Sequence, residues 1–227
     1  MKYSVVATSF NDSNDIVKYL EDICNQTYLP DEIVIADGGS KDDTVEKIKK
    51  FATSSNITIR VVEKGRLNIS QGYNEAIKAA INNVIGITGI GNFYDRAFFE
   101  SLVKEFENND LDYVYSPIRG YDANSFSAKY NKYLLNGEDG NCLKIASNHG
   151  ALLKKNIFEE LNYFYEKFIY AGEDAEFYTL VKDHGYKGKI VKTAKVYWKT
   201  PSSWKEFLKQ IRVYTIADLQ IDSKGQK

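Results

Sequence analysis

Residues 30–44 read Pro-Asp-Glu-Ile-Val-Ile-Ala-Asp-Gly-Gly-Ser-Lys-Asp-Asp-Thr, and this stretch decides the fold class. The apolar, β-branched run Glu32–Ala36 predicts a buried strand. The polar residues after it predict a turn that opens a helix, with Ser40 as the N-cap and Asp42 and Asp43 in the first turn. A strand that passes through a short polar turn into a helix is typical of one unit of a parallel sheet.

The same alternation continues on both sides of this stretch. Because parallel strands with right-handed crossovers bring their carboxyl ends to one edge, we expect a ligand site at the loops that follow the strands. Those loops are 9–14, 37–44, 64–70 and 89–95. We therefore predict an α/β, Rossmann-like fold with a mostly parallel central sheet flanked by helices. The predicted strands are Tyr3–Thr8, Glu32–Ala36, Ile57–Val62 and Val84–Thr88, and the predicted helices are Ile16–Ile23, Val45–Phe51 and Ser70–Ile81.

The second half of the sequence is less regular. It predicts strands at Asp112–Ser116 and Lys189–Trp198, a long loop over the site at Arg119–Asn141, and a closing helix at Ser202–Leu219. With 227 residues, 43% of them hydrophobic, the chain is long enough for one compact domain. We predict a single domain over 1–227, with 1–92 and 93–227 as its two halves.

Composition argues against several classes of protein. The 30 Lys and Arg residues nearly balance the 31 Asp and Glu residues, so nothing predicts bulk binding to nucleic acid. No run approaches the roughly 20 apolar residues that span a bilayer, and the start of the chain lacks a signal-peptide pattern. Cys24 and Cys142 fit no metal-ligand spacing. We expect a cytoplasmic protein.

Five segments of the sequence form an ordered set of motifs: VVATSFND (5–12), PDEIVIADGGSKDDT (30–44), NISQGYNEAI (68–77), GEDAEF (172–177) and QIRVY (210–214). In this order they resemble the motifs of family 2 glycosyltransferases, which have the GT-A fold. The resemblance runs from about Lys2 to Asp218. It implies that the chain binds a nucleotide-sugar donor in its first half and an acceptor in its second.

The pair Glu173 and Asp174 matches the acidic motif on the family's acceptor side. The resemblance implies that Asp174 is the base that deprotonates the acceptor hydroxyl, while Glu173 orients a neighbour or the acceptor. Repulsion between adjacent carboxylates can raise the pKa of one of them toward neutrality. An acidic helix N-terminus is the alternative explanation of the pair.

The resemblance also implies donor contacts at the ends of the strands. Thr8, Phe10 and Asn11 lie in the nucleotide-binding turn, where Phe10 either stacks on the base or is buried against the sheet. Asp37 grips the nucleoside or forms an Asx turn. Gly38 stands where many relatives have a second Asp, which leaves the nucleotide undetermined.

Three further polar side chains have two readings each. Arg66, with Lys64, meets the diphosphate or is a solvated loop charge. Asn74 contacts the donor or lies on an exposed helix face. His149 hydrogen-bonds a hydroxyl or is structural.

The family's metal-binding Asp-x-Asp motif corresponds here to Gly89, Ile90, Gly91 and Asn92, which carry no carboxylate. Trp198 stands where relatives have a His. Asp95 is a nearby carboxylate with the wrong spacing. Three explanations stay open: transfer without a metal, using Lys or Arg; Mn²⁺ or Mg²⁺ held by other residues; or a protein that binds without turnover.

The closing helix carries Gln210 and Tyr214, which match the family's last motif and are predicted substrate contacts. Lys205, Lys209 and Arg212 lie beside apolar residues of this helix. Such a helix either lies on a membrane surface or packs on the domain. The sequence is compatible with a homodimer and does not fix the oligomeric state.

We predict an inverting glycosyltransferase that moves a sugar from a UDP-linked donor to a glycan or lipid-linked acceptor in bacterial surface polysaccharide synthesis. The alternative is an inactive relative that binds a nucleotide sugar or a partner. A nucleotidyltransferase would need a Gly-rich basic loop after the first strand, and residues 9–14 do not provide one.

Overall fold

The computed structural model describes residues 1–120, 142–143, 146–168, 171–199, 201 and 203–224. In this part of the chain a seven-stranded sheet forms the centre of the molecule, in the order β10-β6-β9-β4-β1-β2-β3. Its neighbouring strands are parallel except on either side of β9. The predicted α/β class is confirmed. The strands are β1 (Ser4–Ser9), β2 (Glu32–Asp37), β3 (Thr58–Glu63), β4 (Val84–Thr88), β6 (Tyr113–Tyr115), β9 (Gly150–Lys154) and β10 (Gly188–Ile190).

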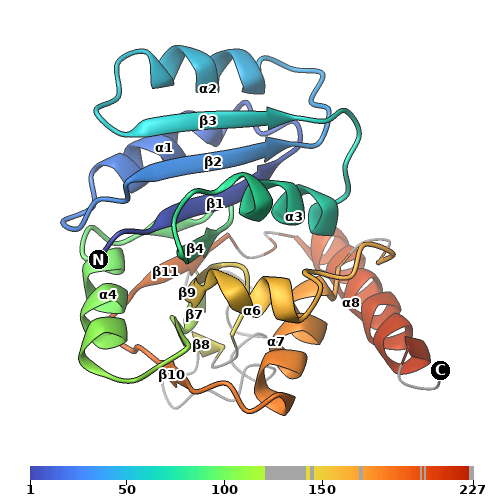
Figure 1. Cartoon of the computed structure of the whole chain (residues 1–227). Helices are drawn as coiled ribbons and strands as arrows, with labels where there is room; N and C mark the ends of the chain where they lie inside the picture. The colour runs from blue at the N-terminus through green and yellow to red at the C-terminus, as the bar shows by residue number, and fades with distance from the viewer. Residues whose placement is uncertain (121–141, 144–145, 169–170, 200, 202, 225–227) are drawn as a thin grey trace.

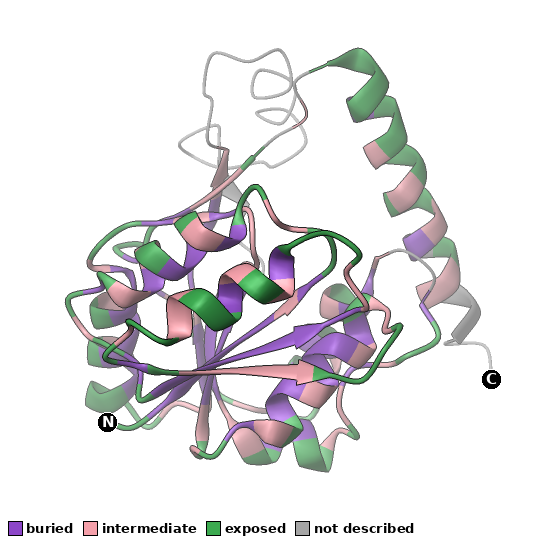
Figure 2. Ribbon diagram, turned by 90° about the horizontal axis from the view of Figure 1, so that it is seen from above, coloured by how far each residue is buried: buried purple, intermediate pink, exposed green. Residues whose placement is uncertain are grey.

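Helices cover both faces of this sheet (Figures 1 and 2). Successive residues of β1 show the division, because side chains alternate along a strand. Val5 packs in the core with α1, α2 and α4, whereas Val6 packs in the core with α3, α6 and α7. The helices are α1 (Ile16–Cys24), α2 (Thr44–Ala52), α3 (Ile69–Ala79), α4 (Phe98–Asn108), α6 (Lys155–Glu160) and α7 (Glu173–Asp183).

The start of α2 differs from the prediction. The helix begins at Thr44 with Asp43 at the N-cap, so Ser40 is not its cap. The hydroxyl of Ser40 donates to Asp37 Oδ1 at 2.5 Å, because Asp37 draws the preceding turn around its own carboxylate. The strand before it and the helix after it are otherwise where the sequence predicts them.

A second, four-stranded sheet lies beside the first, in the order β5-β11-β7-β8. It corrects the prediction of one strand over Lys189–Trp198. The chain pairs with β6 as β10, turns, and pairs with β5 and β7 as β11. The strands are β5 (Phe93–Tyr94), β7 (Ile118–Gly120), β8 (Cys142–Leu143) and β11 (Val196–Trp198). Most of the predicted loop Arg119–Asn141 lies outside the described residues.

The last helix, α8 (Trp204–Lys224), lies at the margin of the molecule and is mostly exposed (Figure 2). Phe207 and Ala217 are buried, whereas Trp204 and Leu208 are 57% and 60% exposed. The predicted apolar side of the helix is thus divided between a packed and an exposed face. Within the described residues, no helix is long and apolar enough to cross a bilayer.

Candidate active site

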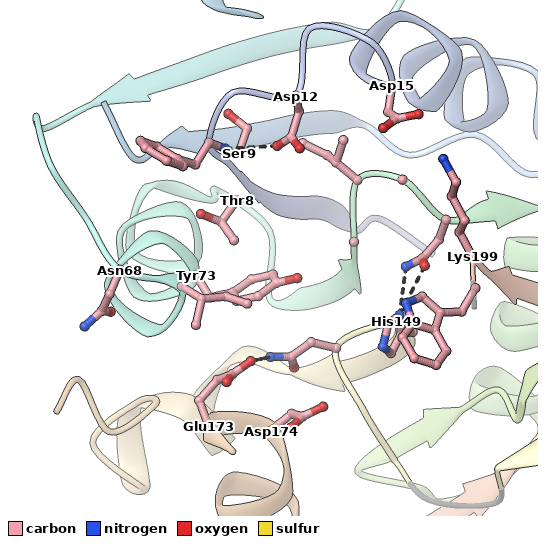
Figure 3. A pocket seen from close by; sticks show the side chains of 18 of the residues that line it. Thr8, Ser9, Asp12, Asp15, Asn68, Tyr73, His149, Glu173, Asp174 and Lys199 are labelled. Carbon is pink, nitrogen blue, oxygen red and sulfur yellow. Dashed lines mark hydrogen bonds between the residues drawn. The ribbon is translucent and has the colours of Figure 1, made fainter. Parts of the chain in front are cut away.

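A cleft of about 500 Å³ opens where β1 and β4 end, at the edge that the parallel arrangement predicts. Its walls come from the loops after β1, β3 and β4, from the first turn of α7, and from the end of β11. Figure 3 shows Asp12 and Asp15 on one side and Glu173 and Asp174 on the opposite side. The lining residues are Thr8, Ser9, Phe10, Asp12, Asp15, Leu67, Asn68, Ile69, Tyr73, Gly89, Ile90, Gly91, Asn92, Asn148, His149, Glu173, Asp174, Trp198 and Lys199.

The turn after β1 provides one wall. Thr8 donates to the carbonyl of Ala36 at 3.3 Å, which ties the end of β1 to β2. The ring of Phe10 is 56% exposed, so the alternative that it is buried against the sheet is wrong. Phe10 lines the main cleft and also a second, adjoining cleft. An exposed ring in this place offers a flat surface on which a base can stack.

Two carboxylates of this wall, Asp12 and Asp15, were not predicted. Asp12 Oδ2 accepts from the backbone of Phe10 at 2.9 Å, which shapes the turn. Burial raises the pKa of Asp12, with a smaller effect from the acidic groups around it. Asp12 lies within the loop 9–14, which the sequence predicts to border the site, so Asp12 could have been predicted from its place in that loop. Asp15 lies one residue beyond that loop.

Asp37 and Asn11 hold the turns together and line neither cleft. The carboxylate of Asp37 accepts from Gly39 N, Ser40 N and Ser40 Oγ at 2.5–2.9 Å, and from Ser9 Oγ at 3.2 Å. This is the Asx turn of the alternative reading. Asn11, in a left-handed conformation with φ 56°, accepts from Lys41 N at 2.8 Å. Both side chains use their oxygens within the protein.

The second cleft, of about 370 Å³, lies between the loops after β2 and β3. Gly38 and Arg66, which are two of the predicted donor contacts, line this cleft. A Cβ on Gly38 would lie 3.1 Å from the carbonyl of Leu67 and 3.2 Å from that of Ser9, so a larger residue here would need backbone to move. The lining residues are Phe10, Gly38, Arg66, Leu67, Asn68 and Gln71.

Asn74 is buried and lines neither cleft. Its amide exchanges two hydrogen bonds with the backbone of Phe164, each 2.9 Å, and donates to Glu166 at 2.9 Å. Neither predicted reading holds, because the side chain is not exposed and it is occupied within the chain. It ties α3 to the segment that leads into α7.

The first turn of α7 brings Glu173 and Asp174 to the cleft. Glu173 is 4% exposed, and burial, followed by repulsion from Asp174, raises its pKa to about 7. Folding therefore favours the neutral form of the Glu173 carboxyl. Asn148 Nδ2 donates to Glu173 Oε1 at 3.3 Å. The buried Oδ1 of Asn148 has no hydrogen-bond partner among the described residues, and Asn148 lines the main cleft.

The turn after β4 is closed by a contact between Asn92 and His149. The Asn92 amide nitrogen lies 2.9 Å from His149 Nδ1. The ring centroids of His149 and Trp198 are 5.8 Å apart. Burial lowers the pKa of His149, while the charge of Asp174 acts in the opposite direction. Gly89 and Gly91 line the cleft with backbone alone. A Cβ on Gly89 would come within 2.7 Å of Asn92 Nδ2.

These residues do not fit a divalent metal of the kind that the resemblance implies. Mn²⁺ and Mg²⁺ prefer carboxylate and carbonyl oxygens, and residues 89–92 offer no carboxylate. The Asn92 amide is already bonded to His149. The described part of the chain has no group of three or more His, Cys, Asp or Glu side chains placed to hold an ion.

Gln210 and Tyr214 lie on α8 and line neither cleft. Gln210 Nε2 donates to the hydroxyl of Tyr214 at 3.1 Å. Burial raises the pKa of Tyr214, with smaller contributions from Asp174 and Glu173. Neither of these two predicted substrate contacts therefore lies in a cleft.

Comparison with known proteins agrees with this architecture. Residues 4–162 match the model of the family described as "Glycosyl transferase family 2". This chain belongs to that family. The match includes every lining residue of the second cleft and those of the main cleft up to His149, and it ends before the acids of α7.

The relatives that this member of the family matches are longer than the chain itself. EpsJ of Bacillus subtilis, an uncharacterized glycosyltransferase, is 26% identical over 188 residues, which are 77% of this chain and 54% of EpsJ. Among solved structures, residues 1–349 of S. aureus TarS in complex with UDP have a TM-score of 0.71 at 17% identity, over 96% of this chain and 65% of that fragment. A mannosyltransferase from Pyrobaculum calidifontis with GDP-Man and Mn²⁺ has a TM-score of 0.71 at 20% identity, over 89% and 58%. These structures show that the fold is GT-A.

Proposed function

We propose that this chain transfers a sugar from a nucleoside-diphospho-sugar to an acceptor hydroxyl, with inversion at the anomeric carbon. The observation that carries the proposal is that α7 places Asp174 in one cleft with the ends of β1 and β4 (Figure 3). A single carboxylate base suffices for a direct displacement, because the acceptor attacks from the face opposite the leaving group. In this proposal Asp174 takes the hydroxyl proton and Glu173 positions the acceptor.

The donor nucleotide lies across both clefts in this proposal. Its base stacks on Phe10 in the second cleft, beside Gly38 and Arg66. Its sugar reaches the main cleft, where the unpartnered oxygen of Asn148 accepts from a hydroxyl. The fold neighbours bind UDP and GDP-Man, and we propose a UDP-linked donor.

The acceptor that we propose is a glycan or a lipid-linked sugar of a bacterial surface polysaccharide. The family and the bacterial origin of EpsJ support this class of acceptor. On α8, exposed Trp204 and Leu208 lie near Lys205 and Lys209. An apolar surface with cations beside it suits peripheral contact with an anionic membrane, where a lipid-linked acceptor would be met.

A second candidate function is binding without turnover. Gly89 and Gly91 favour it, because they leave residues 89–92 without the carboxylates that hold a metal in active relatives. In that case the clefts bind a nucleotide sugar or a protein partner, and Asp174 carries out no chemistry.

Turnover separates the two candidates. The protein is screened for binding and transfer with UDP-, GDP-, CMP- and dTDP-sugars, in EDTA and in Mn²⁺. With the donor that reacts, Asp174→Asn is expected to lower kcat by about 10²- to 10⁴-fold, the usual contribution of a general base. Asp183→Asn, at the exposed end of the same helix, is the matched control. Equal turnover by the Asp174→Asn variant and the wild type would remove Asp174 as the base.

A further inference from the structure

The main cleft contains one fixed positive charge. Among its described lining residues, Lys199 is the single Lys or Arg, while four of the lining residues carry carboxyl groups. Lys199 nevertheless forms no ion pair within 4.0 Å in the described part of the chain. Its ammonium group is therefore available to an anionic ligand.

Lys199 lines the same cleft as the acids of α7. Figure 3 shows its side chain extending from the end of the cleft beside His149 toward the side of Asp15. The second cleft adjoins the main cleft through Phe10, Leu67 and Asn68, which line both. A donor with its base in the second cleft and its anomeric carbon near Asp174 therefore has its diphosphate in the cleft that Lys199 lines.

A diphosphate in this cleft needs a counter-charge. Asp12, Asp15 and Asp174 are carboxylates that line this cleft, and like charges disfavour an anion. Residues 89–92 lack the carboxylates that would hold a divalent cation there. Since the diphosphate gains negative charge as it leaves, a cation fixed beside it stabilises the transition state more than the ground state.

Resting on the proposed function, we infer that Lys199 supplies this charge in place of a metal ion. The acceptor oxygen forms a bond to the anomeric carbon, and the bond from that carbon to the β-phosphate oxygen breaks. The electron pair of the broken bond stays on the phosphate oxygen, and the hydroxyl proton passes to Asp174. The ammonium group of Lys199 donates a hydrogen bond to the leaving phosphate and keeps its own protons.

Calorimetry in EDTA tests this role without knowledge of the sugar. The probes are UDP and GDP, compared with uridine and guanosine. We expect Lys199→Ala to weaken binding of the preferred diphosphate by about 10- to 100-fold, as expected for one charge-assisted hydrogen bond, and to leave nucleoside binding unchanged. Lys199→Arg should retain most of the affinity. With a reactive donor, kcat of the Ala variant should fall by about 10²- to 10³-fold.

Two further variants make the test specific. Lys195→Ala, an exposed lysine on the same segment outside the cleft, should bind like the wild type. Arg66→Ala, in the second cleft, should weaken nucleoside and diphosphate together. Two outcomes would overturn the role of Lys199 and leave the proposed donor site standing. One is an unchanged ratio of diphosphate to nucleoside affinity in Lys199→Ala, and the other is diphosphate binding that requires Mn²⁺. Failure of the wild type to bind any nucleotide or nucleoside would overturn the proposed donor site as well.

Discussion

Glu173 is the residue whose environment predicts a pH dependence of stability. Its pKa rises from 4.5 to about 7 on folding, mainly through burial. Between these values the folded chain binds more protons than the unfolded chain, so the free energy of unfolding falls as pH rises and then stays level above about 7. Glu173→Gln is neutral throughout. We expect its stability relative to the wild type to grow by about 3 kcal/mol between pH 4.5 and pH 8.

Urea unfolding of both proteins at several pH values measures this difference. Glu159→Gln, at an exposed position on α6, controls for the general effect of an amide. A constant difference between Glu173→Gln and the wild type across the range would show that Glu173 is charged in the folded protein.

At the scale of elements, the contact between α7 and α8 depends on Gly172. This residue is the N-cap of α7, with φ 102°, and a Cβ on it would lie 3.1 Å from Ala217 Cβ on α8. Gly172→Ala would therefore strain the backbone and push α8 away, which shifts Glu173 and Asp174. We expect a loss of about 1–2 kcal/mol from the backbone conformation, together with reduced donor turnover.

Gly185→Ala is the matched control for this prediction. Gly185 has φ 79° at the other end of α7, and no atom lies within 4 Å of its added Cβ. It should lose similar stability in thermal unfolding and keep its turnover. Equal effects on turnover would mean that the contact with α8 does not position the acids.

At the scale of the whole molecule, the large sheet joins the two halves of the chain. β4 pairs with β1 from the first half and, over five residues, with β9 from the second. Neither half completes the sheet alone, so we expect one cooperative transition by calorimetry. Far-UV circular dichroism and the fluorescence of Trp198 and Trp204 should report the same midpoint. Two separate midpoints would show that the halves unfold independently.

The sequence by itself determined the first three βα units and β4. Each of these elements depends on the spacing of apolar residues within about ten positions of the sequence. This spacing can be recognised without knowing which strands and helices the element contacts. It also marked the loops after β1, β3 and β4, because all parallel strands end at one edge. The prediction of one strand over Lys189–Trp198 was wrong, because this segment forms two short strands in different sheets. They are distinguished by their partners, β6 and β7, which are distant in sequence.

The tertiary structure alone decided which polar side chains face the cleft. Asp37 and Asn74 have residue types that suit a site, yet both are occupied by hydrogen bonds within the chain. Asp15 and Lys199 face the cleft although no local pattern marks them. Orientation depends on contacts between residues that are distant in sequence, as when α7 brings Glu173 beside Asn148. A local pattern holds no information on such contacts, and so the site's residues, unlike its edge of the sheet, required the folded chain.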